Sequence, residues 1–168
     1  MTTKTDTVVV TDANVLINFC HIGHLTLLGA LKPYRFVVPV EVINEITEPT
    51  QQAEIANALE QGLIAKTVID SIKALALFAT LRDRMGRGEA ACLALAETEG
   101  WMIASDEKRR FRREAVERIG EARIVGTASL LRHAITIERI SVAEADGFKV
   151  LLESKRFVMP FASFGDPA

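Results

Sequence analysis

The sequence has 168 residues, a length typical of one domain, with 49% hydrophobic and 25% charged residues. This composition excludes a disordered chain, and the net charge of −2 argues against nucleic-acid binding through overall positive charge. No apolar run reaches the roughly 18 residues that span a bilayer, and segment 1–7 lacks a signal-peptide core. We therefore expect a cytoplasmic protein that has no membrane partner.

The first part of the chain alternates strand and helix patterns. The β-branched run at 7–11 predicts a buried strand, and Pro33 and Pro49 are each expected to end a helix. The expected elements, in chain order, are a strand at 7–11, helices at 15–20 and 25–31, a strand at 35–38, helices at 40–46 and 53–60, and a short strand at 63–69.

The second part continues this alternation. Gly86-Arg87-Gly88 is expected to interrupt the chain between two helices. The expected elements are a helix from 70 to about 85, a helix at 89–99, a strand at 101–104, a charged helix ending at 119, a strand at 123–125, and helices at 127–135 and 142–153. The order predicts one α/β domain over 1–168, with a mainly parallel sheet covered on both faces. The apolar tail, 157–168, is expected either to pack on the domain or to contact a partner.

Acidic residues follow two of the predicted strands. Asp12 directly follows the strand at 7–11, and Asp106 directly follows Ser105 at the end of the strand at 101–104. The carboxyl ends of parallel strands share one edge of a sheet, and ligands bind outside that edge. Taken singly, each of these acids fits a helix cap.

Two glutamates extend this pattern. Glu45 lies on the helix after the second strand, and Glu89 lies in the first turn of the helix after Gly88. Singly, Glu89 would offset a helix dipole and Glu45 would lie on a solvated helix face. Together with the two aspartates they would repel one another unless a divalent cation were bound. Ligands that are all oxygen suit Mg²⁺ or Mn²⁺ better than zinc.

Four segments of the chain resemble the PIN-domain family in order and spacing. The matching segments are Val8-Val9-Val10-Thr11-Asp12-Ala13-Asn14-Val15-Leu16-Ile17, Val38-Pro39-Val40-Glu41-Val42-Ile43-Asn44-Glu45-Ile46, Gly86-Arg87-Gly88-Glu89-Ala90-Ala91 and Ile103-Ala104-Ser105-Asp106. Segment 124–127 is similar to the last strand and turn of that family. The second segment favours Glu45 over Glu41 as the acid of the pattern. The resemblance implies a three-layer PIN-like fold over nearly the whole chain.

The resemblance also implies a function and its residues. Asp12, Glu45, Glu89 and Asp106 would be catalytic and bind Mg²⁺ or Mn²⁺, and Asn14 and Thr127 would support them. Many relatives carry a second aspartate where this chain has Glu107, so a fifth acid stays open. The chain looks most like PIN proteins with a Gly-Arg-Gly-Glu motif, which are similar to the ribonucleases of toxin–antitoxin pairs. The expected partners are RNA, a small antitoxin and a second copy of the chain.

Basic residues flank two of these acids in sequence. Such residues would position RNA by its phosphates without reading sequence. The candidates are Arg84, Arg87, Lys108, Arg109 and Arg110. Each could equally lie on a solvated helix face, paired with Glu114 or Glu117.

One alternative to an enzyme remains open, and other classes of protein are excluded because their motifs are absent. A catalytically silent PIN-like scaffold that binds metal or RNA remains the alternative to an enzyme. Gly86-Arg87-Gly88-Glu89 lacks the third glycine of a dinucleotide fingerprint, and neither a P-loop nor a receiver-type acid set occurs. Cys20 and Cys92 have no CxxC or Cys/His spacing, so we expect reduced thiols and no zinc site.

Overall fold

A computed structural model describes residues 5–167 of the chain. Its centre is a five-stranded sheet in the order β3-β2-β1-β4-β5, and every neighbouring pair is parallel. The strands are β1 (Thr7–Thr11), β2 (Tyr34–Pro39), β3 (Ala65–Thr67), β4 (Met102–Ala104) and β5 (Ile124–Val125). Val9 is in register with both Phe36 of β2 and Met102 of β4, which places β1 in the middle. The predicted parallel α/β sheet is therefore confirmed.

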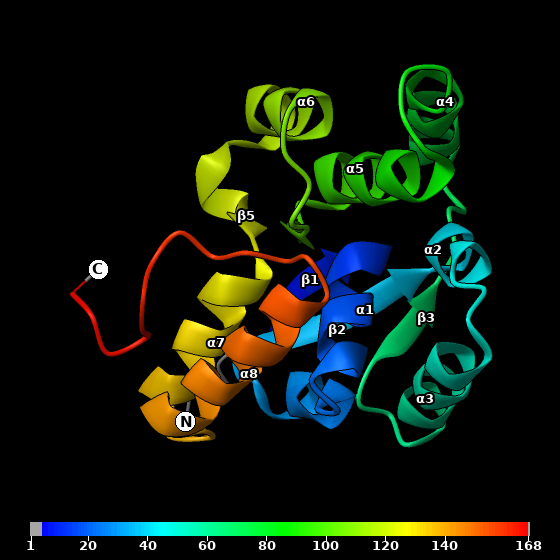
Figure 1. The fold of residues 1–168 in the computed structure, drawn as a ribbon. Coiled ribbons are helices and arrows are strands. Elements are labelled where there is room, and N and C mark those ends of the chain that lie inside the picture. The colour runs from blue at the N-terminus through cyan, green and yellow to red at the C-terminus, as the bar shows by residue number, and fades with distance from the viewer. Residues whose placement is uncertain (1–4, 168) are drawn as a thin grey trace.

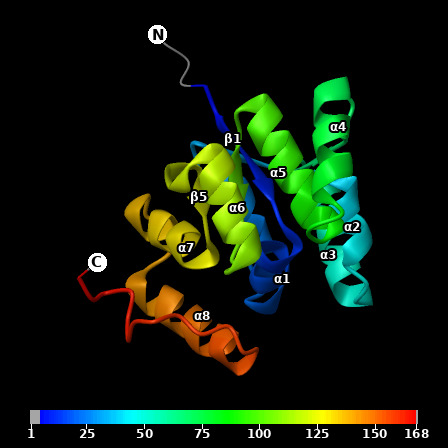
Figure 2. The same cartoon turned by 90° about the horizontal axis from the view of Figure 1, so that it is seen from above.

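Helices lie on both faces of this sheet (Figures 1 and 2). On one face α5 (Arg87–Glu99) contacts β1 and β4, and α4 (Ile72–Leu81) and α6 (Arg110–Ile119) pack beside it. The other face is covered by α1 (Ala13–His21), α3 (Pro49–Glu60), α7 (Thr127–Thr136) and α8 (Val142–Ser154). The short α2 (Val40–Glu45) packs against α5. This is the three-layer arrangement that the sequence predicts.

The core lies along the central strand and the helix above it. Val9 and Val10 of β1 are completely buried, as is Leu93 of α5. Helix α5 is buried from Ala90 to Ala96, because it lies between the sheet, α4 and α6. A helix that is apolar on all sides fits only such a central position. Its alanines leave room for the sheet to approach closely.

Pro49 has the opposite role from the one predicted. It begins α3, where it was expected to end the preceding helix, so α3 starts four residues before the predicted helix at 53–60. Proline suits the first helical position because its missing N–H needs no partner there. Glu48 caps the same end, since its side chain accepts hydrogen bonds from the backbone N–H groups of Thr50 and Gln51.

Other element bounds differ in smaller ways. Residues 25–30 form a 3₁₀ helix (η1, Leu25–Ala30) where an α-helix was predicted, and a second 3₁₀ turn (η2, Glu121–Arg123) precedes β5. Helix α4 ends at Leu81 and not near 85. Arg87 and Gly88 lie inside the first turn of α5, so only Gly86 stands outside that helix, as its N-cap. The strand predicted at 63–69 is reduced to β3.

The segment after α8 folds back onto the domain, as expected for the tail (red in Figure 1). Asp146 of α8 accepts hydrogen bonds from Ser163 Oγ at 2.6 Å and from the Phe164 backbone N–H at 2.8 Å. The Arg132 guanidinium of α7 lies 4.5 Å from the centre of the Phe161 ring. These contacts fix the course of the chain beyond the end of α8.

Among residues 5–167 no helix is both long enough and apolar enough to cross a membrane.

Candidate active site

Asp12 lies where β1 ends and α1 begins. It is the N-cap of α1, and its Oδ1 accepts a hydrogen bond from the Ala13 N–H at 2.8 Å. Its Oδ2 accepts from Ser105 Oγ at 3.3 Å, across the junction with the neighbouring strand. The capping role considered from sequence is therefore present, and the same side chain faces the carboxyl edge of the sheet.

Asp106 is held by three side-chain and backbone donors. Its Oδ1 accepts from the Thr127 N–H at 2.8 Å, and its Oδ2 accepts from Asn18 Nδ2 at 2.9 Å. The Thr127 hydroxyl also donates to Oδ2. Gly126 leaves space for this carboxylate, because a β-carbon at that position would lie 2.7 Å from Oδ1. The orientation of Asp106 is thus fixed by α1 and by the start of α7.

Asn14 joins Asp106 and Glu107 in the loop after β4. Its Oδ1 accepts from the Asp106 N–H at 3.3 Å, and its Nδ2 donates to Glu107 Oε1 at 3.1 Å. Glu107 is exposed, yet its charge raises the pKa of Asp12, Glu89 and Asp106. The fifth acid considered from sequence therefore lies beside the other carboxylates.

Glu45 and Glu89 meet at the start of α5. Glu45, the last residue of α2, accepts a hydrogen bond at Oε1 from the Gly88 N–H at 2.8 Å. A β-carbon at position 88 would lie 2.9 Å from Glu45 Cδ and collide with its carboxylate. Glycine at this position therefore allows α2 to bring Glu45 against the N-terminus of α5, where Glu89 occupies the first turn.

Burial and mutual repulsion raise the pKa of three of these carboxyl groups. The pKa of Asp12 is raised to about 7, mainly by burial; the charges of Glu89, Glu107 and Glu45 also raise it, and the hydrogen bond from the Ala13 N–H lowers it. The pKa of Glu89 is raised by burial and then by Glu107 and Glu45. Burial also raises the pKa of Asp106 despite the hydrogen bonds from Thr127 and Asn18. Within 5–167 no Lys or Arg forms an ion pair with these acids, so negative charge accumulates at this edge.

The chemistry of this edge fits a hard divalent cation. Its donors are carboxylate oxygens, and a cation would remove the repulsion that raises their pKa values. As placed in residues 5–167, however, no three Asp, Glu, His or Cys side chains converge closely enough to hold one ion. The structure links Asp12 to Asp106 through their shared neighbours, and Glu45 to the turn that carries Glu89. The four-acid ligand set stays a prediction.

The predicted RNA-binding residues do not lie together. Arg84 forms an ion pair with Glu114 at 3.0 Å, and Arg110 donates to the Arg84 carbonyl at 2.9 Å. Arg87 and Arg109 are exposed near the ends of α5 and α6. Lys108 alone among the five lines a hollow together with Asp106. Of the predicted RNA-binding residues, Arg84 and Arg110 therefore belong to an ion-pair cluster, and Lys108 lies beside Asp106.

Two supporting residues were missed by the sequence analysis. Asn18 is buried and donates to both Asp106 and Thr127, and its only signal is an amide four residues after Asn14 in an apolar helix. Ser105 is buried, donates to Asp12, and accepts from the Glu107 N–H at 3.1 Å. A serine before an acid is too common a pattern to indicate this role.

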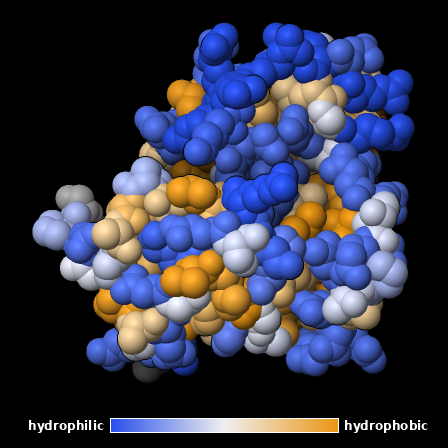
Figure 3. Space-filling model, in the orientation of Figure 1, coloured by the Kyte–Doolittle hydropathy of each residue, from blue (hydrophilic) through white to orange (hydrophobic). Residues whose placement is uncertain are grey.

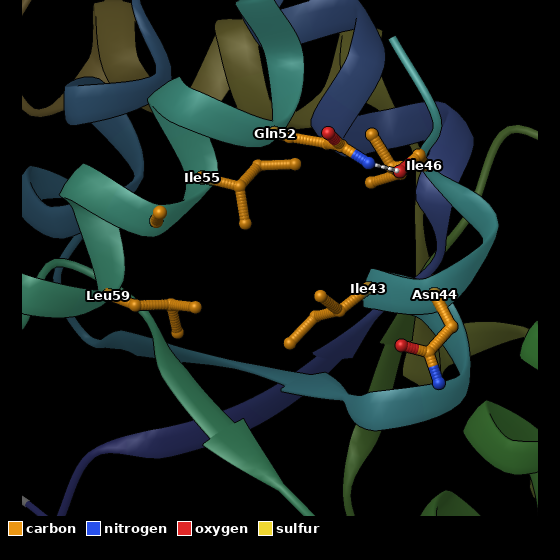
Figure 4. Close-up of a pocket in the computed structure, with 7 residues that line it drawn as sticks. Ile43, Asn44, Ile46, Gln52, Ile55 and Leu59 are labelled. Atoms are coloured by element: carbon orange, nitrogen blue, oxygen red, sulfur yellow. Dashed lines mark hydrogen bonds between the residues drawn. The ribbon is translucent and has the colours of Figure 1, made fainter. Parts of the chain in front are cut away.

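Two hollows differ sharply in chemistry. One, of about 490 Å³, lies between α1, the loop after β4 and the end of α8, and it includes Asp106 and Glu107. The other, of about 330 Å³, lies between α2 and α3 and is lined by Ile43, Ile46, Ile55 and Leu59 (Figure 4). Its polar side chain Gln52 donates to the Ile46 carbonyl at 3.0 Å. No titratable group lines this apolar hollow, whereas Asp106 and Glu107 line the first.

Comparison with known proteins gives one match. The family model DUF3368, described as a PIN domain, matches residues 8–158, which include every acid discussed above. No protein in the curated set matches the chain.

Proposed function

This chain belongs to the PIN-domain family, whose members are generally nucleases, and we propose that it is a ribonuclease dependent on Mg²⁺ or Mn²⁺. The observation that carries the proposal is Asp12: a buried carboxylate with a pKa raised to about 7, facing other acids and no cation. A group in this state gains most from a bound metal ion. The reaction would be hydrolysis of an RNA phosphodiester.

Asp12, Glu45, Glu89 and Asp106 are the residues that would hold the ion. When bound, it would supply positive charge for the phosphodiester and lower the pKa of a water molecule. Thr127 and Asn18 orient the Asp106 carboxylate, and Ser105 orients that of Asp12. Fixed carboxylates lose little entropy when they bind a ligand, so these neighbours raise the affinity of the site.

The test is RNA cleavage with Mg²⁺, Mn²⁺ or EDTA, using the parent chain beside Asp12→Asn. Asp6→Asn serves as the matched control, because Asp6 is an exposed aspartate just before β1, at the opposite, amino edge of the sheet. We expect metal-dependent cutting by the parent and the control, and loss of cutting in Asp12→Asn with the fold intact. Cutting by Asp12→Asn at the parental rate would exclude this assignment.

The proposal extends to a toxin of a toxin–antitoxin pair, acting in the cytoplasm as a homodimer. It rests on the resemblance of Gly86-Arg87-Gly88-Glu89 to the motif of such proteins. The test is expression in a bacterial host alone and together with the product of a small neighbouring gene. Growth arrest that requires Asp12 and is relieved by co-expression supports the toxin; normal growth with active enzyme contradicts it. Sedimentation of the pure chain tests the dimer.

A catalytically silent metal- or RNA-binding scaffold is the second candidate. It is favoured by the separation of the acids, since no three converge on one ion within 5–167. A silent scaffold with a real metal site would melt at higher temperature with Mn²⁺, yet leave RNA uncut. Metal-dependent cutting that is lost in Asp12→Asn would exclude it.

A further inference from the structure

Three cations surround the hollow that contains Asp106, which we call the α8 groove. Lys155 and Arg156 directly follow α8, and Lys108 lies on the loop after β4. In the folded chain they line the same hollow, although 47 residues separate Lys108 from Lys155 in sequence. Figure 1 shows why: α8 runs across the face of α7 and ends near the carboxyl edge of the sheet. The fold therefore brings positive charge next to the acids.

These three cations have no carboxylate partners. Lys108, Lys155 and Arg156 are exposed, and within 5–167 none of them forms an ion pair. By contrast, Arg84 and Arg118 are both paired with Glu114, and Arg118 also with Glu97. The surface over α4 and α6 is mostly hydrophilic (Figure 3). The groove thus offers donors that the protein itself leaves unused.

The backbone holds this end of α8 in a defined place. Arg156 adopts a φ of +67°, which reverses the chain, and the Phe157 N–H bonds the Leu152 carbonyl at 2.9 Å. Further along, Asp146 binds Ser163 and Phe164, so the reversed chain stays against α8. Cations on a fixed turn can meet a ligand without ordering a mobile segment first.

The same groove has an apolar side. Phe157 and Val158 follow the two cations, and Val158 is 64% exposed. A basic track beside an aromatic ring is the arrangement that binds an unpaired strand, because phosphates meet the cations while a base packs on the ring. In a duplex the bases are stacked and paired and would not reach Phe157.

We propose that the α8 groove binds an unpaired RNA strand beside the bond to be cut, with Lys108, Lys155 and Arg156 on its phosphates and Phe157 against a base. The assignment rests on the proposed ribonuclease function for its substrate. It explains how a chain with a net charge of −2 can hold a polyanion near a group of carboxylates.

Binding without cleavage tests the groove apart from catalysis. The affinity of Asp12→Asn for a short unpaired oligoribonucleotide, and for the same sequence as a duplex, is measured by fluorescence anisotropy at several salt concentrations. Lys155→Ala with Arg156→Asn is then added to that background; asparagine accepts the positive φ at position 156. The matched control is Lys66→Ala with Lys73→Ala, which removes two exposed charges outside the groove.

We expect the groove variant to bind unpaired RNA about tenfold more weakly, with a salt slope shallower by about 1.4, since each phosphate contact contributes about 0.7. The control and the duplex should change by less than about twofold. Equal loss in the control, equal loss for the duplex, or no binding of unpaired RNA by Asp12→Asn would overturn the proposal. Metal-dependent cleavage by the parent tests the ribonuclease itself, and its absence would leave the groove result standing.

Discussion

Glu114 and Asp12 are two buried carboxylates in opposite surroundings. Glu114 is 7% exposed and is paired with Arg84 at 3.0 Å and with Arg118 at 3.2 Å. Asp12 is 4% exposed, accepts hydrogen bonds from Ala13 and Ser105, and faces the acids Glu89, Glu107 and Glu45.

The first carboxylate is neutralised within the protein, whereas the second is not. A buried acid that already has two arginines contributes to the fold and has no need of a ligand. A buried acid among other acids stores repulsion that only a proton or a cation from outside can relieve. By this contrast we expect Glu114 to contribute to stability and Asp12 to contribute to the reaction. The following changes test that expectation.

Among the changes that keep every acid of the site, Gly88→Ala should give the largest loss of cleavage, because it displaces a carboxylate of the acid edge. The new β-carbon would collide with the Glu45 carboxylate and displace it. Since misplacement of a catalytic group by about 1 Å costs roughly a hundredfold in rate, we expect cleavage to fall by about that factor. Gly147→Ala in α8, where a β-carbon meets nothing within 4 Å, is the control. Equal cleavage rates in the two variants would contradict the role of Glu45.

Thr127→Val should give the next largest effect on activity. It removes the hydroxyl that donates to Asp106 Oδ2 but keeps the backbone N–H that donates to Oδ1. Loss of a residue that orients a metal ligand lowers affinity or activity about tenfold to a hundredfold. Mn²⁺ titration and cleavage rates measure this loss, and Thr127→Ser should recover most of it. A fully active valine variant would show that Asp106 needs no such orientation.

Glu114→Gln should lower the free energy of unfolding and leave the cleavage rate unchanged. It removes the charge shared by Arg84 and Arg118, and a broken pair of this kind at a partly exposed site costs about 2 kcal/mol of unfolding free energy. Urea denaturation measures that loss, and cleavage is assayed well below the melting temperature. If the cleavage rate fell although the protein stayed folded under the assay conditions, Glu114 would belong to the site and the contrast with Asp12 would fail.

Asp12→Asn should change the stability of the metal-free protein in the opposite direction from Glu114→Gln. The pKa of Asp12 is raised from 3.8 to about 7 in the folded state, so the folded state binds more protons than the unfolded state between those values. The contribution of Asp12 to stability in EDTA should therefore fall as the pH rises from about 4 to about 7, by up to about 1.4 kcal/mol per pH unit.

The asparagine variant lacks this titration and should lose that part of the pH dependence. Melting curves in EDTA across this range compare it with the parent chain. Equal pH dependence in the parent and in the asparagine variant would show that Asp12 is not buried without compensation.

Arg84→Gln should give the smallest effect on RNA. Its guanidinium is already bound to Glu114, so its loss should change the affinity for unpaired RNA by less than about twofold. Lys108→Gln, in the α8 groove, should weaken binding more. The reverse order in a binding assay would place the strand over α4 and α6.

Much of the fold could be predicted from the sequence, because local residue patterns decide it. The β-branched run at β1 and the acids after β1 and β4 placed two carboxylates at one edge once the sheet was parallel. Pro49 shows the limit: proline both ends and begins helices, and only Glu48 capping Thr50 and Gln51 decided which. The same ambiguity affected Arg87 and Gly88, whose glycine pattern suggested a break where α5 begins.

The supporting contacts of the site could not be predicted to the same degree. Asn18 and Asp106 are 88 residues apart, and their 2.9 Å hydrogen bond depends on how α1 packs beside the loop after β4. Arg84 and Lys108 have the same charge in sequence, and only the position of Glu114 separates a neutralised cation from a free one.

The sequence by itself determined the parallel α/β fold and the position of Asp12 and Asp106 after its strands, because the alternation of strands and helices along the chain and the residue spacing are local properties with few alternatives. The tertiary structure alone decided which charges are neutralised. It paired Glu114 with two arginines, left Asp12 among acids, and brought Lys155 and Arg156 to the α8 groove. The physical reason is that electrostatic energy depends on distance and burial, which the linear order of residues does not specify.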